Sequence, residues 1–313
     1  MGDGVALQSD RKHLDVIEPR NSIGFLIRRA QQFHTRYWTD EFRGDLTGPQ
    51  YAVLAAVARW PGIDQTRAGE LASLDKSSGA DVINRLAEVG WILRMSGTAD
   101  RRTRLLRLSA PARSALKDIT PRVRRVQRQL LASFTPDDAA AFIRLLAQVA
   151  YRPDSSPAVE PDEADAEVIH MSTAPGHLLR RSLQAHTALW VSSVGDEPTS
   201  SQYGVLATLI LHGEMDQRRL GELTSLDKSV VGDVVARLAR KGWVIRERHP
   251  VDGRRRSLRI SDAGHEEAKL ASPGVSHVQD ALLAPLAVED ATRLVELLTQ
   301  VPDPMVNTPL VPQ

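Results

Sequence analysis

The chain has 313 residues, and its 40 basic and 39 acidic residues leave a formal net charge of +1 at pH 7. It has no cysteine, which excludes disulfides, thiolate catalysis and cysteine-ligated metals. No segment approaches the roughly 18 consecutive apolar residues of a membrane span, and the N-terminus lacks an apolar signal core. These properties predict a cytoplasmic protein of about two domains that needs no cofactor.

The first helices are expected to begin at side chains that can accept a hydrogen bond from the first turn. In chain order, these caps and the approximate ends of their helices are Asn21 or Ser22 to Phe42, Thr47 to Arg59, Thr66 to Ser73, and Asp75 to Gly90. In the last of these helices, Val82, Leu86 and Val89 form an apolar stripe at spacings of three and four. The pattern predicts a helix–turn–helix.

A short hairpin and two further helices are expected next. A strand begins at Trp91, and residues 105–108 alternate as a returning strand does. Pro111 then opens a long helix that Pro121 should kink or interrupt, and a closing helix covers 136–150. This order predicts a winged helix–turn–helix inside a helical frame.

The same order then returns along the chain. Gln50-Tyr51 recurs as Gln202-Tyr203, an offset of 202 − 50 = 152 residues, which is far longer than a solenoid repeat of roughly 20–50 residues. The prediction is a mainly α protein with small β wings, in which two winged domains share a helical dimerisation frame. The expected parts are an N-terminal tail (1–19), a first domain (20–151), an acidic proline-rich linker (152–171), a second domain (172–303) and a C-terminal tail (304–313).

In each copy, small polar and basic side chains follow a tight turn, at the start of the fourth helix. Such a helix suits the major groove of double-stranded DNA, although a helical hairpin that binds no DNA has the same shape. The candidate DNA contacts here are Lys76, Ser77, Ser78, Asn84 and Arg85, with Lys228, Ser229 and Arg237 in the repeat.

Arginines crowd the tip of each predicted hairpin: Arg101, Arg102 and Arg104, and in the repeat Arg254, Arg255 and Arg256. At the tip of a wing, guanidinium groups can contact phosphates or the minor groove, where charge neutralisation supplies much of the affinity. A solvated charge run is the alternative interpretation. The position of the cluster behind a helix–turn–helix in both copies favours DNA contact.

These segments resemble the multiple-antibiotic-resistance-regulator (MarR) family. The matching residues are Leu74-Asp75-Lys76-Ser77, Arg85-Leu86, Gly90-Trp91 and Asp100-x-Arg102, with Asp252-Gly253-Arg254-Arg255 in the second wing. The resemblance implies a dimer with one recognition helix per half-site. Here both subunits lie in one chain, so we expect a monomer that acts as a pseudo-dimer. Its half-sites should be related but non-identical, because Ser78, Gly79 and Asn84 become Val230, Val231 and Ala236.

The first helix carries a candidate ligand site. Leu26, Ala30, His34 and Trp38 recur every four residues, so they form one stripe that must face the interior. Arg28 lies about 120° round the helix from His34 and can reach the edge of that stripe. Guanidinium, imidazole and an aromatic ring together suit a small aromatic carboxylate. A buried histidine without a ligand role is the alternative.

This helix also resembles that of MarR regulators that sense aromatic acids. The resemblance implies inducer contacts by the arginine and the histidine, so Arg28 and His34 are expected in one pocket beside Trp38. Arg180 and His186 are expected in a second pocket beside Trp190. The combined hypothesis is a repressor of transcription that a small aromatic carboxylate releases from DNA.

Three other functions compete with this hypothesis. An enzyme is disfavoured because the sequence has no nucleotide-binding glycine loop, no metal-spaced histidine cluster and no Ser/His/Asp arrangement in a strand–turn–helix context. A winged-helix protein-interaction module would not need arginine-rich wings. A DNA-binding regulator without a small-molecule inducer remains open.

Overall fold

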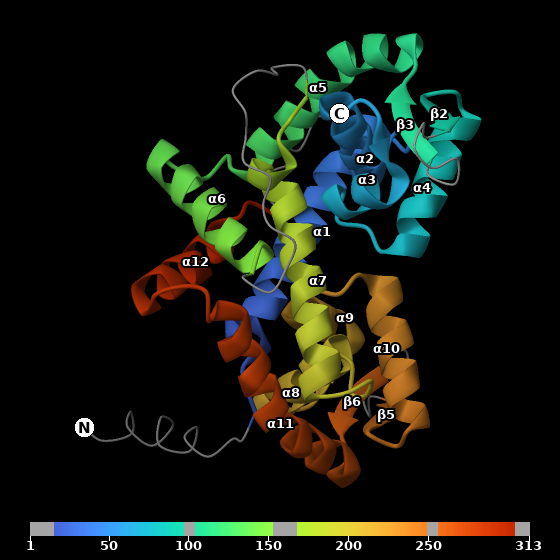
Figure 1. The fold of residues 1–313 in the computed structure, drawn as a ribbon. Helices are drawn as coiled ribbons and strands as arrows, with labels where there is room; N and C mark the ends of the chain where they lie inside the picture. The colour runs from blue at the N-terminus through green and yellow to red at the C-terminus, as the bar shows by residue number, and fades with distance from the viewer. Residues whose placement is uncertain (1–15, 97–103, 153–167, 249–255, 304–313) are drawn as a thin grey trace, which may run out of the picture. The chain divides into compact units, whose positions relative to one another are not determined.

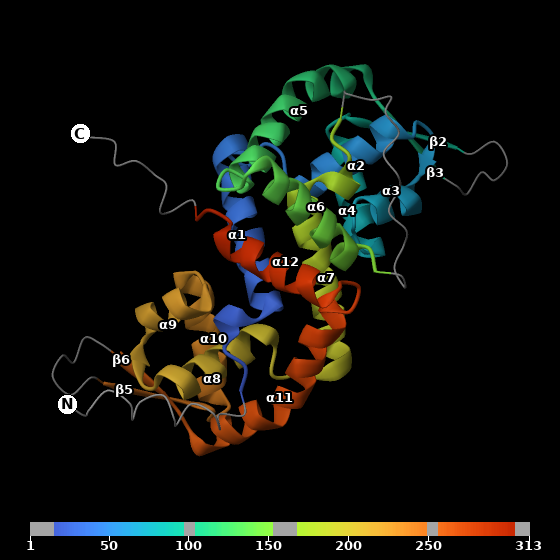
Figure 2. The same cartoon turned by 90° about the vertical axis from the view of Figure 1, so that its left-hand side faces the viewer.

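The chain folds mainly into helices, in an order that occurs twice (Figures 1 and 2). The structure, a computed structural model, describes residues 16–96, 104–152, 168–248 and 256–303. The first copy contains η2 (Pro19–Asn21), α1 (Ile23–Phe42), α2 (Gly48–Arg59), β1 (Ile63–Asp64), α3 (Gln65–Leu71), α4 (Lys76–Glu88), β2 (Ile92–Ser96), β3 (Arg104–Leu108), α5 (Ala110–Leu130) and α6 (Pro136–Ala150). The second contains η3 (Met171–Thr173), α7 (Pro175–Ser193), α8 (Ser200–His212), β4 (Met215–Asp216), α9 (Gln217–Thr224), α10 (Lys228–Arg240), β5 (Val244–Arg248), β6 (Arg256–Ile260), α11 (Asp262–Leu283) and α12 (Val288–Gln300). The predicted fold class is confirmed.

Capping side chains set where the helices begin. Thr47 caps α2 in a capping box with Gln50, and Thr199 caps α8 with Gln202 in the same way. Asp64, not Thr66, caps α3: its Oδ1 accepts a hydrogen bond from the backbone N–H of Arg67 at 2.9 Å. The expectation of a cap at Thr66 was wrong because the chain leaves β1 at Asp64 and turns directly into the helix.

Each wing is the edge of a three-stranded antiparallel sheet. The strand orders are β1-β3-β2 and β4-β6-β5. Ile92 pairs with Leu108 in the first sheet, and Val244 pairs with Ile260 in the second, which keeps the offset of the repeat. The two-residue strands β1 and β4 are too short to show alternation, so the sequence did not predict them.

Two expectations about helix interiors hold only in part. Leu86 is buried and Val82 packs partly buried on the core, as expected, beside buried Gly79 and Ile83, whereas Val89 is 66% exposed. Val89 is the C-terminal cap and has already left the helical spiral. Pro121 neither ends nor divides its helix: α5 runs through it without a break. A proline removes one backbone donor, and the buried residues along the rest of α5 hold the helix together.

The compact units of the fold cut across the two copies. The first-copy unit comprises Ile27–Gln184 and Pro285–Gln313, and the second-copy unit comprises Met1–Leu26 and Ala185–Ala284. The divisions fall inside α1 and α7. Each unit is therefore built around one winged region and is completed by segments that belong to the other copy.

A buried tyrosine in each unit holds the incoming segment. In the first-copy unit, the backbone N–H of Ile169 donates to the hydroxyl of Tyr51 at 3.1 Å, and Val168 is part of the core. In the second-copy unit, the N–H of Ile17 donates to the hydroxyl of Tyr203 at 3.1 Å. Residues 16–19 and 168–171 thus pack on the winged regions, although the sequence placed them in a tail and a linker. Their apolar side chains explain the difference. Within the described ranges, no helix is long and apolar enough to cross a membrane.

Candidate DNA interface and ligand cavity

The first recognition helix, α4, presents most of its predicted DNA contacts to solvent. Lys76, Ser77, Asn84 and Arg85 are exposed. Ser78 is half-buried, and its hydroxyl donates to Asp75 Oδ2 at 2.6 Å. Asp75 Oδ1 also accepts the N–H groups of Ser77 and Ser78, and the hydroxyl of Ser78 is the main reason that the pKa of Asp75 is lowered.

Arg94 of β2 is an addition to this surface that the sequence did not predict. Its guanidinium donates to Asn84 Oδ1, so it orients the amide of that side chain. A side chain ten residues away along the sequence gives no local signal of such a contact.

The second recognition helix, α10, exposes Lys228, Ser229 and Arg237. Val230 is 43% exposed where α4 has Ser78, and Ala236 replaces Asn84, so the two surfaces differ chemically. The predicted difference between Gly79 and Val231 is not part of that surface. Both residues are buried against the preceding helix, where Val231 packs on Gly221 and Gly79 on Gly69.

The wings are described in part. Arg104 is exposed at the start of β3, and Arg256 is the first residue of β6. The other predicted wing contacts lie outside the described residues: Arg101, Arg102, Arg254 and Arg255.

A cavity opens between α1, α2 and α5 on one side and η3 and the start of α7 on the other, all within the first-copy unit. Its empty space, part of which is open solvent, is ≈ 840 Å³. Its apolar and aromatic lining includes Trp38, Tyr51, Val123 and Met171. Its polar lining includes Gln31, His34, Gln127, His177 and Arg180.

His34 lies in this cavity as a neutral ring. It is 7% exposed, and burial, with a smaller effect of the nearby Arg180 charge, lowers its pKa to about 4. Gln127 fixes the tautomer: its Oε1 accepts the N–H of Gly176 at 2.9 Å, so its amide nitrogen is the group 3.3 Å from His34 Nε2. Nε2 must then accept, and the ring proton sits on Nδ1. The ring also packs so closely on Gly176 that no Cβ fits there.

Arg180 brings a positive charge to the cavity from α7. One terminal nitrogen donates to the backbone carbonyl of Ala72 and lies 3.2 Å from Nδ1 of His177. Its Nε is buried and has no hydrogen-bond partner, and within the described residues no carboxylate pairs with it. Burial lowers its pKa to about 10, so the side chain stays charged at neutral pH.

Side chains of α7 also hold the turn between α3 and α4. Ser73, in a left-handed conformation with φ +52°, has its hydroxyl 3.0 Å from His177 Nε2. Gln184 Nε2 donates to the carbonyl of Ser73 at 2.9 Å. Burial, then the charges of Arg180 and Arg181, lower the pKa of His177 well below its usual range. His177 was not among the predicted site residues; the one signal for it in the sequence is that its counterpart in the first copy is Phe25.

The predicted pairing of ligand residues was wrong. The cavity that holds His34 and Trp38 is lined by Arg180 rather than Arg28. The cause is the exchange of segments, because the start of α7 enters the first-copy unit and carries Arg180 with it. His186 is buried against Gly24, and its ring centroid is 5.7 Å from that of Trp190. Both tryptophans are core residues whose indole N–H is bonded, to the carbonyls of Leu46 and Pro198.

The described residues contain no group of three or more His, Asp or Glu side chains that could hold a metal ion. The cavity instead combines one uncompensated cation with neutral donors and an apolar wall. Such a lining can bind a small organic anion without any reaction.

Comparison with known proteins places the chain in a family. Two MarR family models match residues 46–103 and 198–255. The transcriptional regulator HosA of Escherichia coli O157:H7 is 32% identical over 127 residues, which are 41% of this chain and 93% of HosA. The transcriptional repressor NicR of Pseudomonas putida is 26% identical over 41% of this chain and 82% of NicR. The solved structure of the PcaV regulator from Streptomyces coelicolor with its natural ligand is 38% identical, over 44% of this chain and 98% of PcaV, with a TM-score of 0.43.

These relatives are transcription regulators, and each corresponds to less than half of this chain. The two family matches are offset by 198 − 46 = 152 residues, which is the period of the sequence repeat. Both matches include the recognition helices α4 and α10. The chain therefore belongs to the MarR family, of which it carries two tandem copies, and it is a DNA-binding transcription regulator and not an enzyme.

Proposed function

We propose that this regulator is a repressor whose effector is a small aromatic carboxylate bound in the cavity of the first-copy unit. The description of NicR as a repressor supports the direction of regulation. The chemistry of the cavity supports the class of effector. The target of the regulator is double-stranded DNA with two related half-sites, since the exposed residues of α4 and α10 are similar but not the same.

The position of Arg180 is the observation that carries the effector proposal. A buried arginine without a carboxylate partner leaves an unsatisfied cation, and a carboxylate ligand would supply the missing charge and accept the N–H of its Nε. Gln31 Oε1 is also buried without a partner and can accept a hydrogen bond from a ligand hydroxyl. The rings of Trp38 and Tyr51 offer an apolar wall for an aromatic body.

Arg180 also connects the cavity to the DNA-reading surface. The same guanidinium that would meet the carboxylate donates to the carbonyl of Ala72, in the turn just before α4. A ligand that draws Arg180 away from Ala72 would loosen the support of the recognition helix. DNA affinity would then fall by a factor equal to the ratio of ligand affinities of the two states.

The test is calorimetric titration of the full chain with a panel of benzoates and cinnamates. In parallel, fluorescence anisotropy measures binding of the protein to labelled DNA from upstream of the protein's own gene. We expect one or more aromatic acids to bind and to weaken DNA binding. Arg180→Met should reduce acid binding at least about tenfold, the loss expected for a hydrogen bond to a charged group, and Arg180→Lys should be intermediate.

Arg59→Leu is the matched control, because Arg59 does not line this cavity and leucine is its counterpart in the second copy, Leu211. It should leave effector binding intact. If no acid binds at millimolar concentration, the effector proposal fails and a DNA-binding regulator without an inducer remains. A ligand role for Arg28, His186 and Trp190 stays a prediction from the sequence.

A further inference from the structure

The turn between α3 and α4 contains a residue with a strained backbone. Ser73 has φ +52°, in the left-handed region, and the recognition helix α4 begins shortly after it at Lys76. A side chain other than that of glycine remains in this region only where its surroundings hold it. Ser225 is the counterpart in the second copy, with φ +49°. Both turns share this conformation, so the side chains that hold them can be compared.

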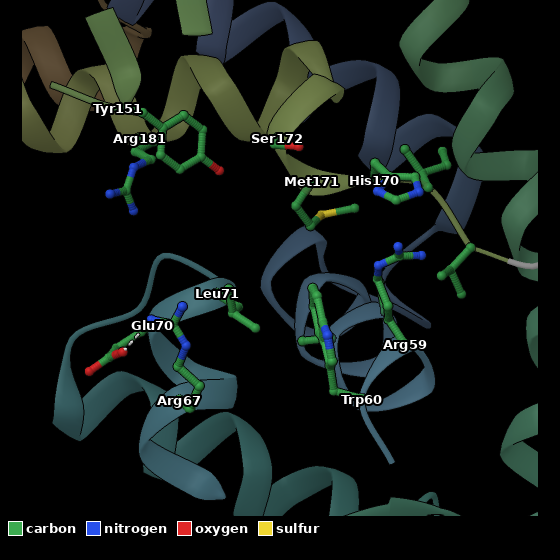
Figure 3. A pocket seen from close by; sticks show the side chains of 14 residues that line it. Arg59, Trp60, Arg67, Glu70, Leu71, Tyr151, His170, Met171, Ser172 and Arg181 are labelled. Atoms are coloured by element: carbon green, nitrogen blue, oxygen red, sulfur yellow. Dashed lines mark hydrogen bonds and ion pairs between the residues drawn. The ribbon is translucent and has the colours of Figure 1, made fainter. Parts of the chain in front are cut away.

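Within the first-copy unit, three side chains of α7 hold Ser73, which is 5% exposed. Its Oγ lies 3.0 Å from Nε2 of His177. Arg181, which lies over the ring of Tyr151 at 4.3 Å (Figure 3), donates to the same Oγ at 3.3 Å. Gln184 donates to the backbone carbonyl of Ser73 at 2.9 Å. The position of α7 therefore determines the support of this turn.

The hydrogen bonds of His177 connect the turn to the effector cavity, which contains His34 and Arg180. A terminal nitrogen of Arg180 lies 3.2 Å from Nδ1 of His177, and a guanidinium can only donate. Nδ1 is therefore the acceptor, and the proton of the neutral ring is on Nε2. That Nε2 donates to Ser73, which is closer than the hydroxyl of Tyr151 at 3.5 Å. The imidazole thus links the guanidinium of the cavity to the hydroxyl of the turn.

The second copy cannot form this imidazole link. The counterpart of His177 is Phe25, a buried side chain that has no atom able to donate or accept a hydrogen bond. The end of α9 is contacted instead by Arg20 of η2, which donates to the carbonyls of Glu222 and Leu223, each at 3.3 Å. A contact from outside α1, the counterpart of α7, therefore supports the approach to the second turn.

We propose that His177 is a positioning residue that transmits occupation of the effector cavity to the first recognition helix, so that the effector releases the half-site bound by α4 before the half-site bound by α10. The inference rests on the proposed effector at Arg180. A carboxylate that takes the terminal nitrogen of Arg180 removes the hydrogen bond to Nδ1 of His177. The imidazole loses the donor that orients it, its bond to Ser73 weakens, and the strained turn before α4 loses support.

The fusion of the two copies makes such a division possible. Two identical subunits would carry the same residue at this position in both lobes. In this chain the position holds His177 in one copy and Phe25 in the other. One reading surface can therefore respond to the effector through this link while the other keeps the protein on its DNA.

The test uses the full-length protein with 4-hydroxybenzoate as the probe, because this acid has a carboxylate for Arg180 and a hydroxyl for Gln31. Calorimetry measures binding of the acid. Hydroxyl-radical footprinting of DNA from upstream of the protein's own gene measures the protection of each half-site as the acid is added. Arg85→Ala and Arg237→Ala, which each weaken one half-site, assign the half-sites to α4 and α10. In the wild type, the half-site of α4 should lose protection at acid concentrations that leave the half-site of α10 protected.

Ser73→Ala removes the acceptor of the link without changing the cavity, which Ser73 does not line. It should bind the acid as the wild type does, bind DNA about fivefold more weakly without acid, and show little further loss at the half-site of α4. His177→Phe, which copies the second copy, should behave in the same way toward DNA. His177→Gln should restore the response, because its amide can accept from Arg180 and donate to Ser73. Ser225→Ala is the matched control and should respond as the wild type does.

Equal loss of protection at both half-sites in the wild type overturns the inference. An unchanged response in Ser73→Ala, or the same change in Ser73→Ala and Ser225→Ala, overturns it as well, once circular dichroism has shown that the variants fold. These results leave the proposed function intact, because the acid still binds and still weakens DNA binding. If 4-hydroxybenzoate and the other acids do not bind the wild type, the proposed function fails and the role of His177 fails with it.

Discussion

His34 is held as a neutral ring, and its protonation in the folded protein lowers the stability of the fold. Its ring packs on Gly176, and its Nε2 already accepts from the Gln127 amide. Burial lowers its pKa from 6.5 to about 4. Between these two pH values the unfolded chain binds the proton and the folded chain does not. Stability is therefore highest above pH 6.5 and falls as the pH drops toward 4.

The loss can reach about 3 kcal/mol for His34, as an upper bound from the size of the pKa difference. We expect denaturant unfolding at a series of pH values to show this decline in the wild type. His34→Gln should have a shallower slope over the same range, even if it is less stable at neutral pH. His177, whose pKa is lowered in the same direction, keeps some slope in the variant. Equal slopes in the two proteins would contradict the assignment.

The N-terminal caps of the two recognition helices provide a matched pair. Asp75 accepts hydrogen bonds from the N–H groups of Ser77 and Ser78, whereas Asp227 makes no side-chain cap hydrogen bond to α10. Asp75→Ala should lower the midpoint of thermal unfolding by a few degrees, and Asp227→Ala should lower it less. Calorimetric scans of both variants check this order. A larger effect at Asp227 would mean that the caps do not set helix stability here.

For the wings, we expect an effect on the affinity for DNA rather than on the stability of the fold. Arg102 and Arg254 occupy equivalent places in the two hairpin tips and lie outside the described residues. If they contact phosphates, replacing both by Ala should weaken binding to every DNA sequence and flatten the dependence of affinity on salt. Titrations at several salt concentrations, with operator and unrelated DNA, measure both effects. Unchanged affinity in the double variant would remove the wings from the interface.

Elements with local signals could be predicted from the sequence. The closing helix α6 begins at Pro136 and ends at Ala150 as expected, because Thr135 caps it and the proline fits the first turn. Contacts between distant segments could not be predicted in this way. Arg180 and His34 line one cavity because a segment of the second copy enters the first-copy unit. The sequence repeat does not show which copy supplies the segment that enters each unit. Arg94 beside Asn84 is a second example.

At the scale of the whole molecule, each unit depends on both copies. In the first-copy unit, α12 packs on α6, and Arg144 pairs with Asp290 at 3.2 Å. Arg293 of α12 bonds to Asp138 of α6. Residues 16 and 17 complete the second-copy core, and Val168 completes the first. One chain supplies all of these segments, with an effective concentration of order millimolar set by the linker.

We therefore expect a monomer in solution, with light scattering near 34.4 kDa over a wide range of concentration. A stable mass of twice that value would show that the segments are exchanged between chains instead.

A protease site placed within residues 153–167 sharpens the test. After cleavage the two fragments should stay together at the same total mass, because the exchanged segments, rather than the peptide bond, hold the fragments together. Tyr51→Phe with Tyr203→Phe removes the hydroxyls that bind Ile169 and Ile17, and it should make the cleaved fragments separate more readily than those of the parent. Fragments that separate at once in the parent protein would mean that the linker, and not the exchange, keeps the two copies paired.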